Sequence, residues 1–256
     1  MTEHLPQLDP VALGCLVGVG ILAGIINVLA GGGSLLAMPV AIFVGLPEGM
    51  ANGTVRLAIL AQNLTALTRY HRAQALNLEG IAPIVGFTVA GAILGSLVGS
   101  QLSDSGTRNA LGIALLAAVV LVVARPHERQ RAGTPTVPPM AAGLVMAAIG
   151  VYGGAIQAGV GYLFLFALTY LYGMDLVRAN TLKIVLVTAY TPLVLFAFWG
   201  ESRVHLVAGL ALAIGQALGA WIGASLALSK GATIIRLALL VAVTLSAAKL
   251  LLPTLD

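Results

Sequence analysis

The sequence contains few charged residues. Only 9% of its 256 residues are Asp, Glu, Lys or Arg, whereas a soluble domain carries about a quarter. Hydrophobic residues make up 59% of the chain, and they occur in long runs that do not alternate with polar residues. Such runs are typical of membrane-spanning helices, so the composition predicts an all-α integral membrane protein.

The sequence also lacks the residues that several chemistries require. Its single cysteine, Cys15, excludes an intrachain disulfide. There is no cluster of metal ligands, no zinc-protease motif and no nucleotide-binding loop ending in lysine. We therefore predict no catalytic residue, no metal site and no cofactor, and we do not expect an enzyme.

No Asp or Glu lies near the middle of any predicted span, and His71 and His205 lie at span ends. Proton-coupled carriers often use carboxylates or histidines within the membrane. Their absence argues against a cationic substrate. The formal net charge is +4, but the basic residues fall at helix ends and in one linker. This placement reports membrane topology, so the expected partner is a lipid bilayer and not a nucleic acid.

Three consecutive glycines, Gly31 to Gly33, interrupt an apolar run between Pro10 and Pro47. Each glycine costs about 1 kcal/mol against alanine inside a helix. A bilayer tolerates a broken helix only where the freed backbone groups are buried in protein or face a cavity. The break therefore predicts a ligand site between helix ends. Close helix packing through small residues is the alternative.

The chain reads as two repeated halves. Residues 1–124 form the first transmembrane repeat, 125–139 a polar, arginine-containing linker, and 140–256 the second repeat. A shift of 127 or 128 positions aligns Thr54-Val55-Arg56 with Thr181-Leu182-Lys183, Glu48 with Asp175, Gly91 and Gly95 with Gly219 and Gly223, and Arg108 with Arg236. The expected spans are 11–45 (interrupted), 51–69, 80–101 and 108–124, then 139–173 (interrupted), 178–199, 205–228 and 232–252. Each half thus has about four spans, and the first span of each half is interrupted at glycines.

The topology of the interrupted blocks stays open at this point. If each block crosses once, the halves are parallel; if each is a hairpin, there are five segments in each half and the halves are inverted. Under either alternative the Arg69/Arg72 loop and the 125–139 linker lie on the same side, which the positive-inside rule makes cytoplasmic. Gly91, Gly95 and Gly99 share one face of the 80–101 span and predict tight helix contact.

Arg56 and Lys183 are the most informative charged residues. Each lies about five residues into a span, hence about 7 Å below its end. Cations at such depth face partners or a water-filled path, unless they extend to the lipid headgroups. Two cations at equivalent positions predict one central site for a small anion. Polar side chains surround them in the sequence: Asn27, Ser34, Asn52, Thr54, Gln62 and Asn63 in the first half, and Gln157, Asn180, Thr181 and Thr188 in the second.

The sequence resembles the TauE/SafE family of sulfite exporters, also called the TSUP family. The resemblance rests on Gly31-Gly32-Gly33-Ser34-Leu35-Leu36 with Met38-Pro39, on Gly45-Leu46-Pro47 followed by Ala51-Asn52-Gly53-Thr54, and on the glycine-spaced stretch 91–99. The duplicated organisation extends it over essentially the whole chain. The second half departs from the pattern, because Gly153 to Gly161 is looser and no proline follows.

The resemblance implies a multi-pass carrier in the bacterial inner membrane. Its expected substrates are small sulfur-containing anions such as sulfite, thiosulfate or organosulfonates, and export by alternating access is the expected mode. Alternatives are a scaffold or assembly factor that transports nothing, a carrier for an uncharged molecule, and a channel; a homo-oligomer is left open. The predicted substrate-binding residues are Asn27, Gly31, Gly32, Gly33, Ser34, Asn52, Thr54, Arg56, Gln157, Gly159, Gly161, Asn180, Thr181 and Lys183.

Overall fold

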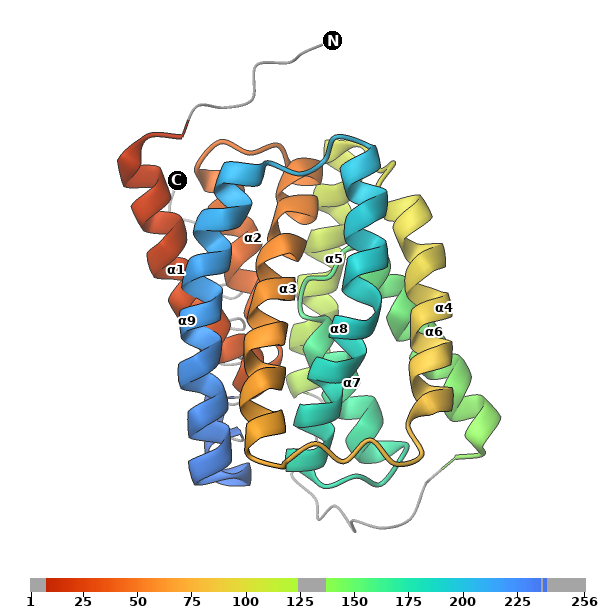
Figure 1. The fold of residues 1–256 in the computed structure, drawn as a ribbon. Helices are drawn as coiled ribbons and strands as arrows, with labels where there is room; N and C mark the ends of the chain where they lie inside the picture. The colour runs from red at the N-terminus through yellow and green to blue at the C-terminus, as the bar shows by residue number, and fades with distance from the viewer. Residues whose placement is uncertain (1–7, 124–136, 236, 239–256) are drawn as a thin grey trace.

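The computed structural model describes residues 8–123, 137–235 and 237–238 (Figure 1). Within these ranges the chain is helical and contains no strand, which confirms the predicted all-α class. The predicted linker 125–139 lies outside the described residues up to position 136, and the predicted span 232–252 lies outside them from 239 onward. The helices are α1 (Pro10–Ala30), α2 (Ser34–Phe43), α3 (Glu48–Arg72), α4 (Ala82–Gly99), α5 (Asp104–Val123), α6 (Pro139–Ala155), α7 (Val160–Tyr170), α8 (Leu176–Gly200) and α9 (Leu206–Lys230).

Both predicted interruptions are present. After α1, Gly31 adopts φ +88° and its N–H donates to the carbonyls of Ile26 and Asn27, which ends the helix in a left-handed cap. After α6, Gln157 and Gly159 have positive φ values of +66° and +69° before α7 begins. The three adjacent glycines at the first break and the more widely spaced glycines at the second therefore each end a helix in the interior of the protein.

Each interrupted block is a hairpin. In Figure 1, α1 begins and α2 ends at the upper end of the bundle, whereas α6 begins and α7 ends at the lower end. Helices α2 and α7 have 10 and 11 residues, about half the length that a bilayer requires. Of the two topologies left open by the sequence, the structure shows the hairpin form, with the two hairpins entering from opposite ends. Duplication of the sequence itself stays a prediction.

Small residues bring helices of the two halves together. A Cβ atom on Gly91 or Gly95 of α4 would lie 2.0 Å from the carbonyl oxygen of Ala147 or Val151 on α6. On α9, a Cβ atom on Gly219 would lie 2.1 Å from the carbonyl oxygen of Ile21 on α1. The predicted tight contact of the α4 glycines is confirmed, and α9 packs against α1 in the same way.

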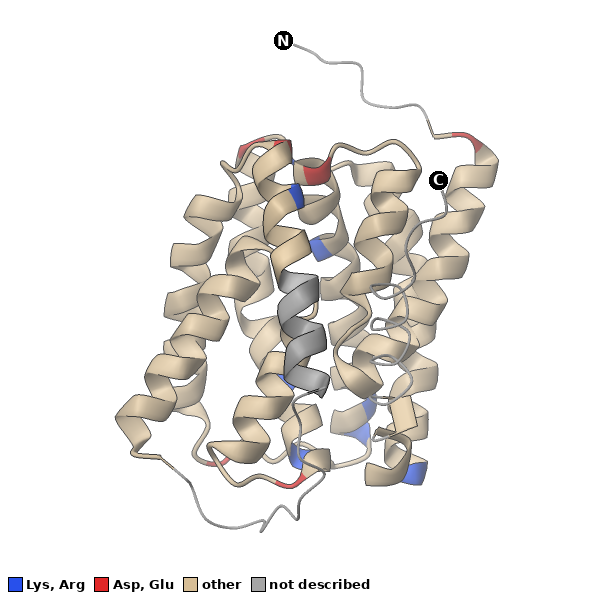
Figure 2. Cartoon of the chain, turned by 180° about the vertical axis from the view of Figure 1, so that it is seen from behind, with Lys and Arg blue, Asp and Glu red and all other residues tan. Residues whose placement is uncertain are grey.

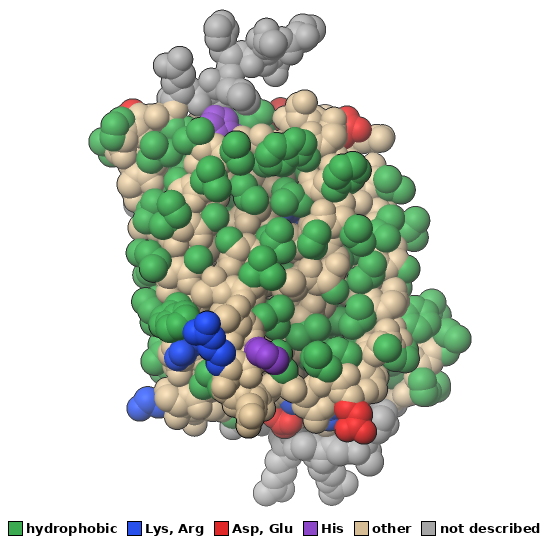
Figure 3. Space-filling view, in the orientation of Figure 1, with side chains coloured by type: hydrophobic (Ala, Val, Ile, Leu, Met, Phe, Trp, Pro, Cys, Tyr) green, Lys and Arg blue, Asp and Glu red, His purple; other side chains and the backbone are tan. Residues whose placement is uncertain are grey.

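The surface fits a bilayer. Helices α1, α4, α8 and α9 are long and apolar enough to cross a membrane, and apolar side chains cover the middle of the molecule in Figure 3. Charged residues lie mainly near the two ends (Figure 2). The chain is therefore a multi-pass membrane protein.

Hydrogen bonds between charged and polar groups assign the loops to the two ends. At one end Arg108 pairs with Glu48 and Arg203 pairs with Asp104; the hydrogen bond from Arg108 lowers the pKa of the Glu48 carboxyl. At the other end Arg178 donates to the carbonyl of Glu79. The 173–178 loop therefore lies at the end that carries Arg69 and Arg72.

Candidate functional site

The two breaks meet at the centre of the protein. A Cβ atom added to Gly31 would lie 2.5 Å from the carbonyl carbon of Gly161, and one added to Gly161 would lie 2.4 Å from Cα of Gly31. Ser34 ties the breaks together, because its hydroxyl accepts from the N–H of Gly159 (3.0 Å) and donates to the carbonyl of Gln157 (3.3 Å). Only glycine allows backbones of the two halves to approach so closely.

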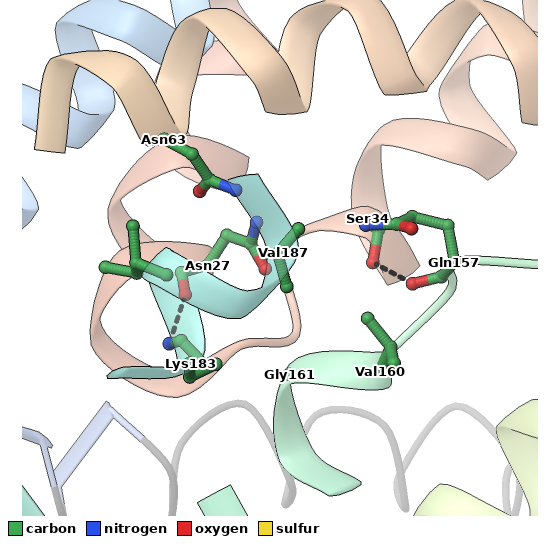
Figure 4. Close-up of a pocket in the computed structure, with 9 residues that line it drawn as sticks. Asn27, Ser34, Asn63, Gln157, Val160, Gly161, Lys183 and Val187 are labelled. Atoms are coloured by element: carbon green, nitrogen blue, oxygen red, sulfur yellow. Dashed lines mark hydrogen bonds between the residues drawn. The ribbon is translucent and has the colours of Figure 1, made fainter. Parts of the chain in front are cut away.

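A small cavity lies beside this contact (Figure 4). Its free volume, measured for the centre of a water-sized sphere, is about 10 Å³, which is room for about one water molecule. One part of its wall is polar and another is aliphatic. The lining residues are Asn27, Ser34, Asn63, Gln157, Val160, Gly161, Lys183, Ile184 and Val187.

Arg56 of α3 is completely buried. It does not line the cavity itself but bonds to Gln157, which does. Its guanidinium donates to the carbonyls of Gly153 (3.0 Å) and Gly154 (2.8 Å) at the end of α6. It also donates to Oε1 of Gln157 and Oδ1 of Asn52 and lies 4.4 Å from the centre of the Phe198 ring. Arg56 therefore satisfies carbonyls that the end of α6 leaves without a helical partner.

Lys183 of α8 makes the corresponding contacts with the other broken helix. Its ammonium donates to the carbonyls of Asn27 (2.9 Å) and Val28 (3.2 Å) near the end of α1, and to Oδ1 of Asn180 (2.8 Å). Each cation thus caps a broken helix of the opposite half. The negative end of a helix dipole favours a cation at such a position.

The partners of both cations are neutral. In the described part of the chain, ion pairs involve Arg108 and Arg203 at the end of the bundle, and neither Arg56 nor Lys183 meets a carboxylate. Burying a charge is costly unless it is paired or well hydrogen-bonded. Carbonyl and amide oxygens reduce this cost, but two positive charges remain without a counter-charge beside the cavity.

Two amides of the cavity wall have their oxygens already engaged. Oδ1 of Asn27 accepts from the N–H of Gly33 (3.2 Å). Oε1 of Gln157 accepts from Arg56 (3.2 Å) and from the hydroxyl of Tyr190 (3.0 Å). Because an amide carries its donors on the other atom, the NH₂ groups of Asn27 and Gln157 are the ends left for a ligand.

The predicted site residues divide into three groups. Asn27, Ser34, Gln157, Gly161 and Lys183 line the cavity. A second group supports it: Arg56 and Asn180 as described, Asn52, whose amide donates to the carbonyl of Ala155, and Gly31, Gly32, Gly33 and Gly159 in the breaks.

Thr54 and Thr181 form the third group, because their hydroxyls bond elsewhere. Thr54 accepts from the N–H of His205, and Thr181 donates to the carbonyl of Val177 on its own helix. The structure thus gives these two hydroxyls partners outside the cavity.

The predicted set omits four residues that line the cavity: Asn63, Val160, Ile184 and Val187. Asn63 follows Arg56 by seven residues, or about two helical turns, so the spacing places both on one face of α3. Val187 follows Lys183 by four residues on α8. This helical spacing is the sequence signal that points to Asn63 and Val187.

Two broken helices that enter from opposite ends and meet at a polar centre are the organisation of membrane carriers with discontinuous helices. The chain belongs to the sulfite exporter TauE/SafE family, whose model matches residues 16–250. This match agrees with the resemblance seen in the glycine motifs.

Curated relatives cover most of the chain. It is 28% identical over 257 residues to "Probable membrane transporter protein YfcA" of Escherichia coli (strain K12), covering 97% of this chain and 93% of the relative. It is 28% identical over 226 residues to "Probable membrane transporter protein ORF9" of Sinorhizobium sp, covering 84% and 83%. No solved structure matches the chain. The family and these names point to a membrane transporter and not to an enzyme.

Proposed function

We propose that this protein transports small sulfur-containing oxyanions, such as sulfite or thiosulfate, through its central cavity by alternating access. The observation that carries this proposal is the pair of buried cations, Arg56 and Lys183, which have only neutral partners beside a cavity whose amides present donors. An anion brings the counter-charge that the described residues do not supply.

The helix ends at the breaks favour the same class of ligand. Ser34 and Gly161 lie in the first turns of α2 and α7 and line the cavity. The first N–H groups of a helix have no acceptor within it and carry the positive end of the helix dipole. Backbone N–H groups at such ends bind oxyanions. A ligand that carries only acceptors therefore fits the lining better than a cation does.

The cavity as observed is closed. Room for about one water molecule is too small for a sulfite ion with its four heavy atoms, so transport requires the halves to separate on one side and then on the other. Arg56 and Lys183 connect the halves across the centre. We propose that they hold the closed state together while their charge attracts the substrate.

We further propose that the end with Arg69, Arg72, Arg178 and Lys230 faces the cytoplasm of a bacterial inner membrane. The opposite end has Arg108 and Arg203 among its described cations and carries most of the described acidic residues (Figure 2). Loops rich in Lys and Arg stay cytoplasmic. The predicted linker 125–139 then lies in the cytoplasm as well.

Binding to the purified protein tests the proposed function. We expect sulfite, thiosulfate or sulfoacetate to raise the melting temperature, because a ligand that binds only the folded state stabilises it. Taurine should be weaker than sulfoacetate, since its ammonium group finds donors and cations at the cavity. Lys183→Gln should lose the stabilisation, whereas Arg203→Gln at the end of the bundle should keep it. No effect of any sulfur oxyanion well above millimolar concentration would show that the proposal is wrong.

A further inference from the structure

The polar lining of the cavity includes a third amide, Asn63 of α3, which was not among the predicted binding residues. Its side chain is 2% exposed. Figure 4 shows it on the side of the cavity opposite Val160 and Gly161, with its amide directed toward Asn27. A buried amide in this position needs partners for both of its ends.

The two ends of the Asn63 amide differ in their surroundings. Oδ1 accepts from Nε2 of Gln62 at 2.9 Å. Nδ2 is buried and has no hydrogen-bond partner in the protein. An unsatisfied buried donor costs about 1–3 kcal/mol, and buried polar groups without partners are rare enough to need an explanation.

The donor is aimed at a place where a ligand can satisfy it. Asn27 and Lys183 line the same cavity, and the oxygen of the Asn27 side chain is already engaged by Gly33. The amides of Asn27 and Asn63 therefore present NH₂ groups from α1 and α3, and Gln157 presents one from the second break. Three amides from three segments therefore line the same cavity as the Lys183 ammonium.

We infer that Asn63 is a substrate-binding residue, whose Nδ2 donates a hydrogen bond to an oxygen of the bound oxyanion. This inference rests on the proposed function, because it takes the cavity as the anion site. It adds α3 to the segments that contact the substrate directly. It also gives the Asn63 donor a partner that the described residues do not supply.

Two substitutions separate a binding role from a packing role. Asn63→Asp keeps the shape of the side chain but replaces the donor with a negatively charged oxygen. Asn63→Leu removes both polar atoms at similar volume. We expect the sulfite Kd from thermal-shift titration to rise about 10- to 100-fold in Asn63→Leu, the equivalent of one charge-assisted hydrogen bond. Sulfite binding by Asn63→Asp should be weaker still, because the negative charge of the aspartate repels the anion.

Thr65→Val is the matched control. Thr65 lies on the same helix, but its hydroxyl donates to the carbonyl of Ala61 and does not line the cavity. The sulfite Kd of Thr65→Val should therefore equal that of the parent. Parent-like Kd values in both Asn63 variants, or an equal loss in Thr65→Val, would overturn the role of Asn63 and leave the proposed function standing. An Asp variant that binds better than the Leu variant would also overturn it, since packing alone favours the isosteric residue. If the parent binds neither sulfite nor thiosulfate, both proposals fall together.

Discussion

At the scale of single residues, Arg56 and Lys183 have two roles to reconcile. The sequence predicts that they compensate the charge of an anion, and the structure shows both bound to carbonyls of broken helices. The roles are compatible, because neutral acceptors orient a cation without cancelling its charge. The same contacts keep the broken ends of α1 and α6 satisfied in the interior.

The capping role predicts a large loss of stability when Arg56 is replaced by Met. The carbonyls of Gly153 and Gly154 would each lose a buried donor, whereas the Gln157 oxygen would keep its hydrogen bond from Tyr190. At about 1–3 kcal/mol for each unsatisfied group, the melting temperature in detergent should fall by well over 5 °C. Arg56→Lys should recover part of the loss, because lysine keeps the charge but not the planar fork. A melting temperature equal to that of the parent in Arg56→Met would contradict the capping role.

At the scale of helices, close packing depends on glycines that present bare backbone. Gly91, Gly95 and Gly99 of α4 follow each other at four-residue spacing, and each lies against backbone of α6. This periodicity was visible in the sequence, but its partner was not. Only the folded chain shows that α6, from the opposite half, packs against this glycine face.

The α4–α6 contact predicts that Gly95→Val destabilises the protein strongly. Its Cβ would lie 2.0 Å from the carbonyl oxygen of Val151, so α4 and α6 must move apart. Overpacking of this kind costs about 1–3 kcal/mol or more. Gly86→Val on the same helix is the control, because its Cβ meets no atom within 4 Å. The melting temperatures of the two variants decide the matter, and equal values would mean that the close contact does not form.

At the scale of the whole molecule, the two hairpins decide how the chain crosses the membrane. Helices α2 and α7 return to the end from which α1 and α6 entered (Figure 1). The halves are thereby placed in opposite orientations, with each cation of one half bound to the broken helix of the other. Both halves therefore contribute residues to one central cavity.

The hairpin topology predicts which positions are accessible from each side. In a Cys15→Ser background, Asp9→Cys, Pro47→Cys and Ser202→Cys should react together with a membrane-impermeant maleimide in intact cells. Asn77→Cys should react only after the membrane is permeabilised, if the basic end is cytoplasmic. Labelling of Asp9→Cys and Pro47→Cys from opposite sides would contradict the α1–α2 hairpin. Reversal of the whole pattern would contradict only the proposed orientation.

Much of this architecture follows from the sequence. Long apolar runs determine the class, because backbone groups in a bilayer must be satisfied within helices. The triple glycine determines the first break, since glycine supports a helix poorly and permits the positive φ of Gly31. Arg56 and Lys183 stand out because charges are rare at such depth.

Other features were decided only by the tertiary structure. The sequence left a single crossing and a hairpin open, because both have the same apolar length. It selected Thr54 and Thr181 along with the cavity residues, since adjacency in sequence does not show which way a side chain points. The cations found their carbonyl partners through contacts between segments about 100 or more residues apart. Composition and periodicity act within one helix, whereas these contacts exist only after the two halves have packed together.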